Sequence, residues 1–174
     1  MKTGALVGKL IKVNLILLVA FNSFGFTGES GKEYYRSGQL KIEGAQKNGK
    51  FDGTVKSYHP SGQLESEKVY KDGNLNGKAR EYYINRQLKS EGQYRNGTPD
   101  GKIITYYKNG QLTSEVVYKN GQIDGAVKEY YENGQLQSDK YYNKGVLEGK
   151  VKTYYRNGQL ISEVIYKNGQ VSGM

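Results

Sequence analysis

The chain has 174 residues and a formal net charge of +9, with 17 tyrosines, one histidine and neither cysteine nor tryptophan. This length is typical of one domain, and the absence of cysteine excludes disulfides and thiolate metal sites. The positive charge is modest and spread along the sequence, which is not the pattern of a nucleic-acid-binding patch. We therefore expect no nucleic-acid partner.

The first 25 residues differ in character from the rest of the chain. Three lysines precede an apolar run over residues 13–21, and small or polar residues follow at Ser23 and Gly25. A basic start, a short apolar stretch and a small-residue exit are typical of a secretory signal peptide. We predict a signal helix over residues 1–25 and an exported protein, in the periplasm, on the cell surface or outside the cell. The alternative is an uncleaved anchor, since a membrane span needs about 20 apolar residues; membrane contact is expected only through this segment.

Residues 26–174 form a tandem array with a period of 24 residues. The tetrapeptide Ser/Asn-Gly-Gln-Leu returns at this spacing, and only the third copy has Arg86 where the others have glycine. A fixed period of this length predicts units that bury surface against their neighbours. The six copies are residues 29–52, 53–76, 77–100, 101–124, 125–148 and 149–172.

Each copy contains two strand-like runs, and the copy at 125–148 is the clearest example. Its first run ends at Asn133-Gly134 and its second at Lys144-Gly145. Asn-Gly between two such runs predicts a β-hairpin with a two-residue type I′ turn, because both central residues of that turn need positive φ. The sequence therefore predicts an all-β fold: an elongated single-layer antiparallel sheet of six tandem hairpin repeats, after the N-terminal signal helix.

A two-residue turn at Asn133-Gly134 fixes the register of the hairpin. It places Lys128 opposite Asp139, and opposite charges also meet in most other copies, which supports the register. Glu115 is the exception, because it faces Ile104. The equivalent predicted pairs are Lys56 with Glu67, Arg80 with Glu91 and Lys152 with Glu163.

The same register assigns the repeated columns to the two faces of the sheet, because side chains alternate along a strand. Tyr131 is placed opposite Leu136, and Tyr142 opposite Gly125. Val127 would share the face of these residues, whereas Lys128, Tyr130 and Asp139 would share the other face. The structural columns on the first face are Leu40, Leu64, Leu88, Leu112, Leu136 and Leu160, beside Tyr83, Tyr107, Tyr131 and Tyr155.

Residues 101–122 read Gly-x-x-x-x-Tyr-Tyr-x-Asn-Gly-Gln-Leu-x-Ser-Glu-x-x-Tyr-Lys-Asn-Gly-Gln. This unit resembles the bacterial variant of the MORN repeat, and the resemblance covers residues 29–173. The departures are Arg86 for a turn glycine, His59-Pro60 for Tyr-x, and Gln46 for a later tyrosine. The resemblance implies hairpin arrays used for binding and assembly, without catalytic residues; some bacterial relatives are antitoxins of the YwqK type.

The residues themselves favour no catalytic chemistry, cofactor or metal. His59, the only histidine, stands in a column that is otherwise tyrosine, so we interpret it as a substituted aromatic rather than a base or a metal ligand. The column of acids from Glu43 to Glu163 has basic partners, which favours a solvated row of ion pairs over a calcium site. Serines and threonines have no base to activate them. The sequence predicts that the protein is not an enzyme.

A second tyrosine column is the candidate binding face, because it lies among charges where aromatic rings have no core to fill. Tyrosine offers a large contact area at low entropic cost, and can hold a protein segment or stack on a sugar. We expect an exported repeat protein that binds a protein or cell-surface ligand, including a glycan, and self-association through edge strands. The alternative is an antitoxin that masks a toxin. The column consists of Tyr34, Tyr58, Tyr82, Tyr106, Tyr130 and Tyr154.

Overall fold

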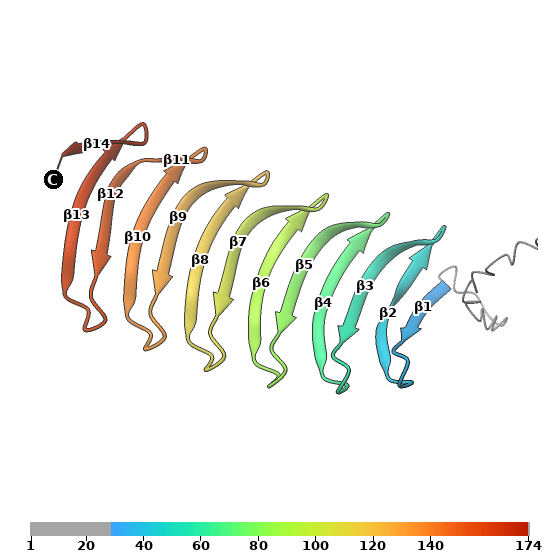
Figure 1. Cartoon of the computed structure of the whole chain (residues 1–174). Coiled ribbons are helices and arrows are strands. Elements are labelled where there is room, and N and C mark those ends of the chain that lie inside the picture. Colours follow the sequence, from blue (N-terminus) through green and yellow to red (C-terminus); the bar gives the residue numbers. More distant parts are fainter. Residues whose placement is uncertain (1–28, 174) are drawn as a thin grey trace, which may run out of the picture.

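The computed structural model describes residues 29–173 as one antiparallel sheet (Figure 1). Consecutive strands are neighbours throughout, except that β11 pairs only with β10. The signal helix predicted for residues 1–25 lies outside the described residues. The strands are β1 (Glu29–Tyr34), β2 (Leu40–Lys47), β3 (Lys50–Tyr58), β4 (Leu64–Lys71), β5 (Asn74–Tyr82), β6 (Leu88–Arg95), β7 (Thr98–Tyr106), β8 (Leu112–Lys119), β9 (Gln122–Tyr130), β10 (Leu136–Asn143), β11 (Val146–Leu147), β12 (Gly149–Tyr154), β13 (Leu160–Lys167) and β14 (Gln170–Gly173).

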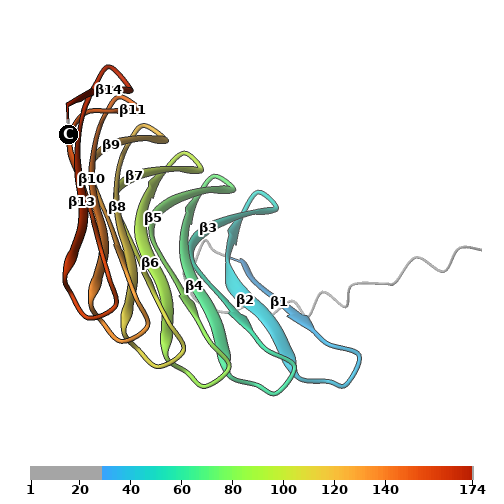
Figure 2. The same cartoon turned by 60° about the vertical axis from the view of Figure 1, so that its left-hand side comes forward.

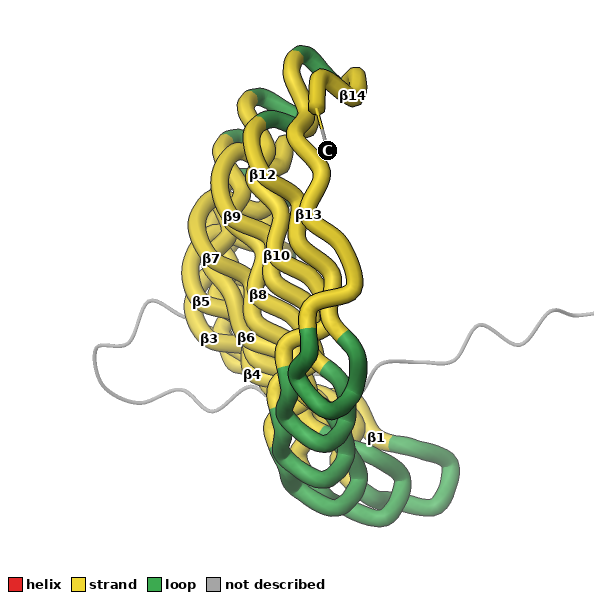
Figure 3. The backbone as a smooth tube through the Cα atoms, turned by 90° about the vertical axis from the view of Figure 1, so that its left-hand side faces the viewer, coloured by secondary structure: helices red, strands yellow, loops and turns green. Residues whose placement is uncertain are grey.

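The sheet is a single curved layer, and its hairpins succeed one another along the array (Figures 2 and 3). No helix and no second sheet cover either face within the described residues. Only three apolar residues are buried there, Val55, Ala79 and Val127. Stability must therefore come mainly from contacts between neighbouring strands, repeated along the array, rather than from one central core.

The two-residue type I′ turn occurs at one end of each hairpin, but not at the end that the sequence predicted. At Lys144-Gly145 both residues have positive φ, 47° and 77°, and Asn143 pairs with Val146 on either side. The same geometry recurs at Asn120-Gly121, where φ is 50° and 82°. The paired positive φ values are those that this turn type requires.

The Asn133-Gly134 loop is instead a three-residue connection, so the predicted turn there is wrong. The Gly134 amide donates to the Tyr131 carbonyl at 2.8 Å, and the Tyr131 amide donates to the Gln135 carbonyl at 2.8 Å. Gly134 has φ of 84°, whereas Asn133 has no positive φ. The side chain of Asn133 accepts a bond from the Gln135 amide at 3.2 Å, which is the local bonding that favours Asn in turns.

The longer loop changes the pairing next to it. Leu136 pairs with Tyr130, not with Tyr131 as predicted, and a bulge follows before Ser138 pairs with Glu129. The extra loop residue and the extra bulge residue offset each other, so Lys128 still pairs with Asp139 and Tyr142 with Gly125. The leucine column therefore stands beside the candidate binding tyrosines: the pairs are Tyr34–Leu40, Tyr58–Leu64, Tyr82–Leu88, Tyr106–Leu112, Tyr130–Leu136 and Tyr154–Leu160.

The third copy keeps the three-residue loop although Arg86 replaces its glycine. The Arg86 amide donates to the Tyr83 carbonyl at 2.8 Å, as in the other copies, but its φ is 69°. An L-residue in the left-handed region costs about 1–2 kcal/mol. The backbone of Arg86 is therefore strained in this loop.

Replacing Arg86 with glycine should raise the free energy of unfolding by about 1 kcal/mol, because glycine adopts positive φ without a steric cost. Urea denaturation monitored by circular dichroism measures the change. Arg86→Ala is the control, since it removes the same side chain but keeps the strain. Equal stability of the Gly and Ala variants would contradict the explanation.

Candidate functional site

One face of the sheet carries a continuous row of alternating charges, which we call the charge row. Each member is the cross-strand partner of the next, because Glu43 pairs with both Lys32 and Lys56, and the same relation continues along the array. The row is Lys32, Glu43, Lys56, Glu67, Arg80, Glu91, Ile104, Glu115, Lys128, Asp139, Lys152 and Glu163.

Three of the four predicted ion pairs of this row form, whereas Lys128 and Asp139 lie opposite each other but make no ion pair among the described residues. Lys56 Nζ lies 3.9 Å from Glu67, Arg80 3.5 Å from Glu91, and Lys152 3.4 Å from Glu163. Ile104 interrupts the alternation as expected, and Lys102 supplies a cation 3.3 Å from Glu115 instead. These side chains are partly exposed, so each pair contributes little stability. What the row provides is a regular, nearly neutral pattern of charge.

The candidate binding tyrosines stand beside this row. We call the charge row and these six tyrosines together the charged face. The Tyr58 hydroxyl donates to Glu43 at 2.6 Å, and the Tyr130 hydroxyl to Glu115 at 3.5 Å. Tyr34 is 59% exposed, whereas the other five are less exposed. Partial burial and the nearby carboxylates raise the pKa of Tyr106 and of Tyr130 above the usual range. The column therefore presents neutral, hydrogen-bonding aromatic side chains.

The hydrogen bond to Glu43 raises the pKa of Tyr58 to about 12. Because this pKa lies above the usual value of about 10, the bond stabilises the fold below pH 10, and that contribution is lost as pH rises from about 10 to about 12. In a tyrosinate absorbance titration, Tyr58→Phe should remove one phenol that ionises late. Glu43→Gln should return that phenol towards pH 10; an unchanged late phase in this variant would show that Glu43 is not the cause.

The opposite face holds the side chains that pack, and we call it the packed face. The three buried apolar residues lie here, with Ser66 and Ser138, which are also buried. Hydroxyl pairs cross the strands, such as Thr105 with Ser114 at 2.7 Å. Lys68 contacts Glu81 at 2.7 Å, and this hydrogen bond lowers the pKa of Glu81. Buried polar groups on this face are thus mostly satisfied by each other.

A ladder of tyrosine hydroxyls joins four of the five pairs of neighbouring repeats, a feature that the sequence did not predict. These tyrosines belong to the column assigned a structural role, and each donates to a backbone carbonyl 23 residues later. The bonds of this tyrosine ladder are Tyr35 to Tyr58 at 2.7 Å, Tyr83 to Tyr106 at 2.7 Å, Tyr107 to Tyr130 at 2.9 Å and Tyr131 to Tyr154 at 2.8 Å. The 24-residue spacing of the column was the available signal, but it does not reveal which atoms the hydroxyls reach.

Within residues 29–173 no three histidine, aspartate or glutamate side chains gather so that they could hold a metal ion. In the same part of the chain, no helix is long and apolar enough to span a membrane. The surface features suited to recognition are the extended charged face and two shallow hollows, one on each side of the sheet.

Comparison with known proteins agrees with the repeat architecture. No curated protein matches the sequence. The family model described as the MORN repeat variant matches residues 30–48, 51–72, 99–120, 123–144 and 147–168, which together are more than half of the chain. The unmatched interval, residues 73–98, contains Ile84 and Arg86, where the repeat departs from its pattern. The tandem hairpins and the family match support a repeat protein with a binding role, and the chain belongs to the MORN repeat variant family.

Proposed function

We propose that this protein is an exported, non-catalytic repeat protein whose charged face binds a protein or a cell-surface ligand. The observation that carries the proposal is the column of six tyrosines at 24-residue intervals, set beside the charge row. The tyrosine ladder and the packed face already hold the array together. The tyrosines of the charged face make few such bonds, so their rings remain available to a ligand.

The pattern of the charged face indicates the kind of ligand. Acids alternate with bases along the row, so an extended polyanion such as a nucleic acid would meet as many repulsive as attractive charges. Rows of tyrosine suit a polypeptide segment or a glycan, which can use both aromatic contact and hydrogen bonds. A ligand that spans several repeats gains from each of them, because contacts on one rigid array act together.

Masking of a toxin is the second candidate, and it would use the same charged face. The export signal predicted for residues 1–25 argues against it, because an antitoxin would have to meet a cytosolic toxin in the cytosol. Fractionation of the native host with N-terminal sequencing of the mature chain separates the two. A chain beginning near Phe26 outside the cytoplasm supports export; an intact Met1 terminus in the cytosol moves the antitoxin to first place.

Self-association through the outer strands is a further part of the proposal. Among the described residues, strand β1 pairs only with β2, and β14 covers only the last residues of β13. Leu160 and Ile161 of β13 are exposed. Unpaired strand edges with apolar side chains favour pairing with another chain. Sedimentation of the full chain over a range of concentrations tests this, and a monomer at the highest concentration would contradict it.

A further inference from the structure

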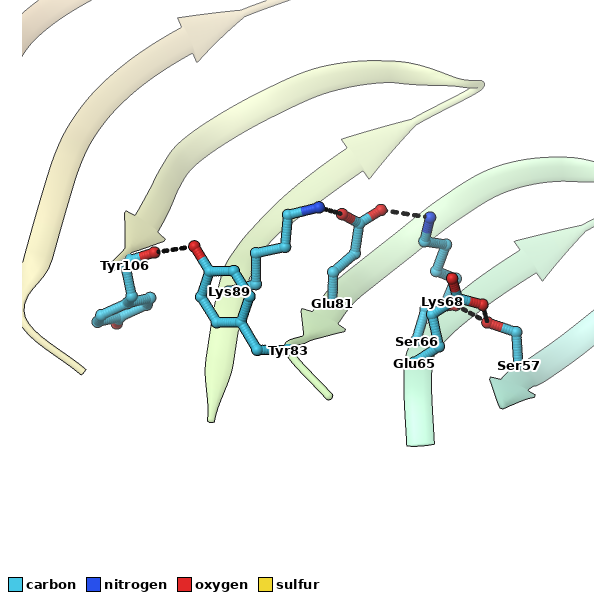
Figure 4. Close-up of polar contacts among 8 residues, drawn as sticks. All are labelled: Ser57, Glu65, Ser66, Lys68, Glu81, Tyr83, Lys89 and Tyr106. Atoms are coloured by element: carbon cyan, nitrogen blue, oxygen red, sulfur yellow. Dashed lines mark hydrogen bonds and ion pairs between the residues drawn. The ribbon is translucent and has the colours of Figure 1, made fainter. Parts of the chain in front are cut away.

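A hollow of about 520 Å³ lies on the packed face over the second and third repeats. Figure 4 shows some of its polar side chains, which come from β3, β4, β5 and β6. Ser57, Ser66 and Lys68 form one side, and Glu81, Tyr83 and Lys89 the other. The hollow therefore spans the boundary between two repeats.

The hollow occurs where the tyrosine ladder is interrupted. His59 occupies the ladder position in the second repeat, and it lines the hollow. The imidazole is shorter than a phenol, and no hydrogen bond from it reaches the Tyr82 carbonyl, the atom that corresponds to the ladder acceptors. The His59 Nε2 atom is buried and has no hydrogen-bond partner among the described residues. A buried polar atom without a partner is costly, unless something else supplies the bond.

Most other polar groups around the hollow are already engaged with each other. Lys68 contacts Glu81 at 2.7 Å, and the Ser57 hydroxyl lies 2.8 Å from that of Ser66 and 3.1 Å from Glu65. Lys89 has only a long contact to Glu81, at 3.7 Å. Lys108 also lines the hollow, and its ammonium makes no ion pair within residues 29–173. The imidazole nitrogen and the Lys108 ammonium thus have no partner among the described residues, and the Lys89 ammonium has only this long ion pair to give up for a ligand.

This combination occurs once in the array. The positions of His59, Lys89 and Lys108 correspond to Tyr35, Glu65 and Ile84 one repeat earlier, and to Tyr83, Thr113 and Glu132 one repeat later. His59 has no counterpart in the other copies, whereas Lys41 stands in the column of Lys89, and Arg36 and Arg156 stand in that of Lys108. His59 and Lys108 lie on either side of the interval that the family model leaves unmatched, and Lys89 lies within it. The departures from the repeat therefore converge on one place in the structure.

We propose that this hollow binds a small oxyanion, a carboxylate or a phosphate group, held by His59 Nε2 and the ammonium groups of Lys89 and Lys108. Charge-assisted hydrogen bonds from such donors are the strong contacts for an oxyanion, and the imidazole would gain the partner that it lacks. The site lies on the packed face and is separate from the charged face, so the proposal does not depend on the identity of the larger ligand.

The single histidine makes a direct test feasible, because its imidazole proton signals in an NMR spectrum belong to His59 alone. Inorganic phosphate and acetate are titrated separately into the full chain at fixed pH and ionic strength, with sodium chloride as the control salt. We expect a saturable shift of the imidazole signals with phosphate or acetate and none with chloride; the anion that saturates identifies the class.

Lysine variants show whether the proposed residues hold the anion. Lys89→Gln combined with Lys108→Gln should weaken binding at least tenfold, since each removes one charged hydrogen-bond donor. Lys71→Gln combined with Lys119→Gln removes the same charge from the exposed ends of β4 and β8, outside the lining of the hollow, and should leave the affinity unchanged. Absence of saturation with both anions, or an equal loss in both double variants, would overturn the proposal.

His59→Tyr tests the structural origin of the hollow. The phenol should restore the missing ladder bond to Tyr82, raise the thermal midpoint and fill the hollow. Because this variant has no histidine signal, its anion binding is followed by calorimetry, and it should be lost. A stable variant that still binds the anion as the wild type does would also overturn the proposal.

Discussion

Replacing Gly125 with alanine is expected to lower the free energy of unfolding by about 2–3 kcal/mol. Gly125 has φ of 137°, a conformation that residues with a Cβ rarely adopt. A Cβ built at this position would lie 2.9 Å from Cβ of Val117 on the neighbouring strand. The substitution therefore combines backbone strain with a steric clash, and urea denaturation measures the sum.

Gly101→Ala is the matched control, because Gly101 occupies the same position in the preceding repeat and has a similar φ of 126°. A Cβ there would lie 3.4 Å from Cβ of Gln93, which is an ordinary contact. The backbone is then penalised without the close approach, and the expected loss is about 1–2 kcal/mol. If both variants lose the same stability, the close approach of Val117 does not restrict Gly125, and the interpretation of this glycine column is wrong.

A triple variant with Tyr82, Tyr106 and Tyr130 replaced by alanine is expected to lose ligand binding by at least 100-fold. Central aromatic contacts in an interface commonly contribute 2 kcal/mol or more each on truncation, although such losses are not additive. The protein is mixed with the isolated envelope of the native host, and the envelope is then pelleted by centrifugation. The measurement is the protein concentration at which binding to the pelleted envelope is half-maximal. A decrease in affinity of less than about threefold would exclude these tyrosines as the binding surface.

The control for this variant is the replacement of Tyr83, Tyr107 and Tyr131 by phenylalanine. These substitutions remove three ladder hydroxyls, so each should lower the free energy of unfolding by about 1 kcal/mol. They leave the charged face intact, and envelope binding should persist. The comparison separates loss of the binding surface from loss of stability. Circular dichroism of both variants confirms that each is folded at the temperature of the assay.

The period of the sequence was sufficient to predict the fold, because a 24-residue hairpin unit can bury surface only by stacking on its copies. The position of Lys128 opposite Asp139 was also predicted correctly. That prediction is correct because the extra residue of the loop is offset by the extra residue of the bulge that follows it. Asn-Gly is compatible with a two-residue turn and with a three-residue loop followed by a bulge, and the sequence at Asn133-Gly134 does not distinguish them.

The role of individual tyrosines was harder to predict than the register of the sheet. Two adjacent tyrosines, such as Tyr106 and Tyr107, look alike in the sequence, but Tyr107 donates to the carbonyl of Tyr130 and Tyr106 does not. The distinction depends on where the loop places each ring relative to the next repeat. His59 was interpreted as a substituted aromatic, and its place in the ladder column agrees with that. The unpartnered nitrogen that it leaves is a property of the packing, which no local pattern expresses.

Site-specific photo-crosslinking in the native host tests most directly whether the charged face is the binding surface. Tyr106 lies on the charged face, and Thr105, the preceding residue of β7, contacts Ser114 on the packed face. A photoreactive amino acid is introduced at one position or the other. We expect a discrete crosslinked product from position 106 and none from position 105. A product from position 105 alone, or no product from either, would contradict this expectation.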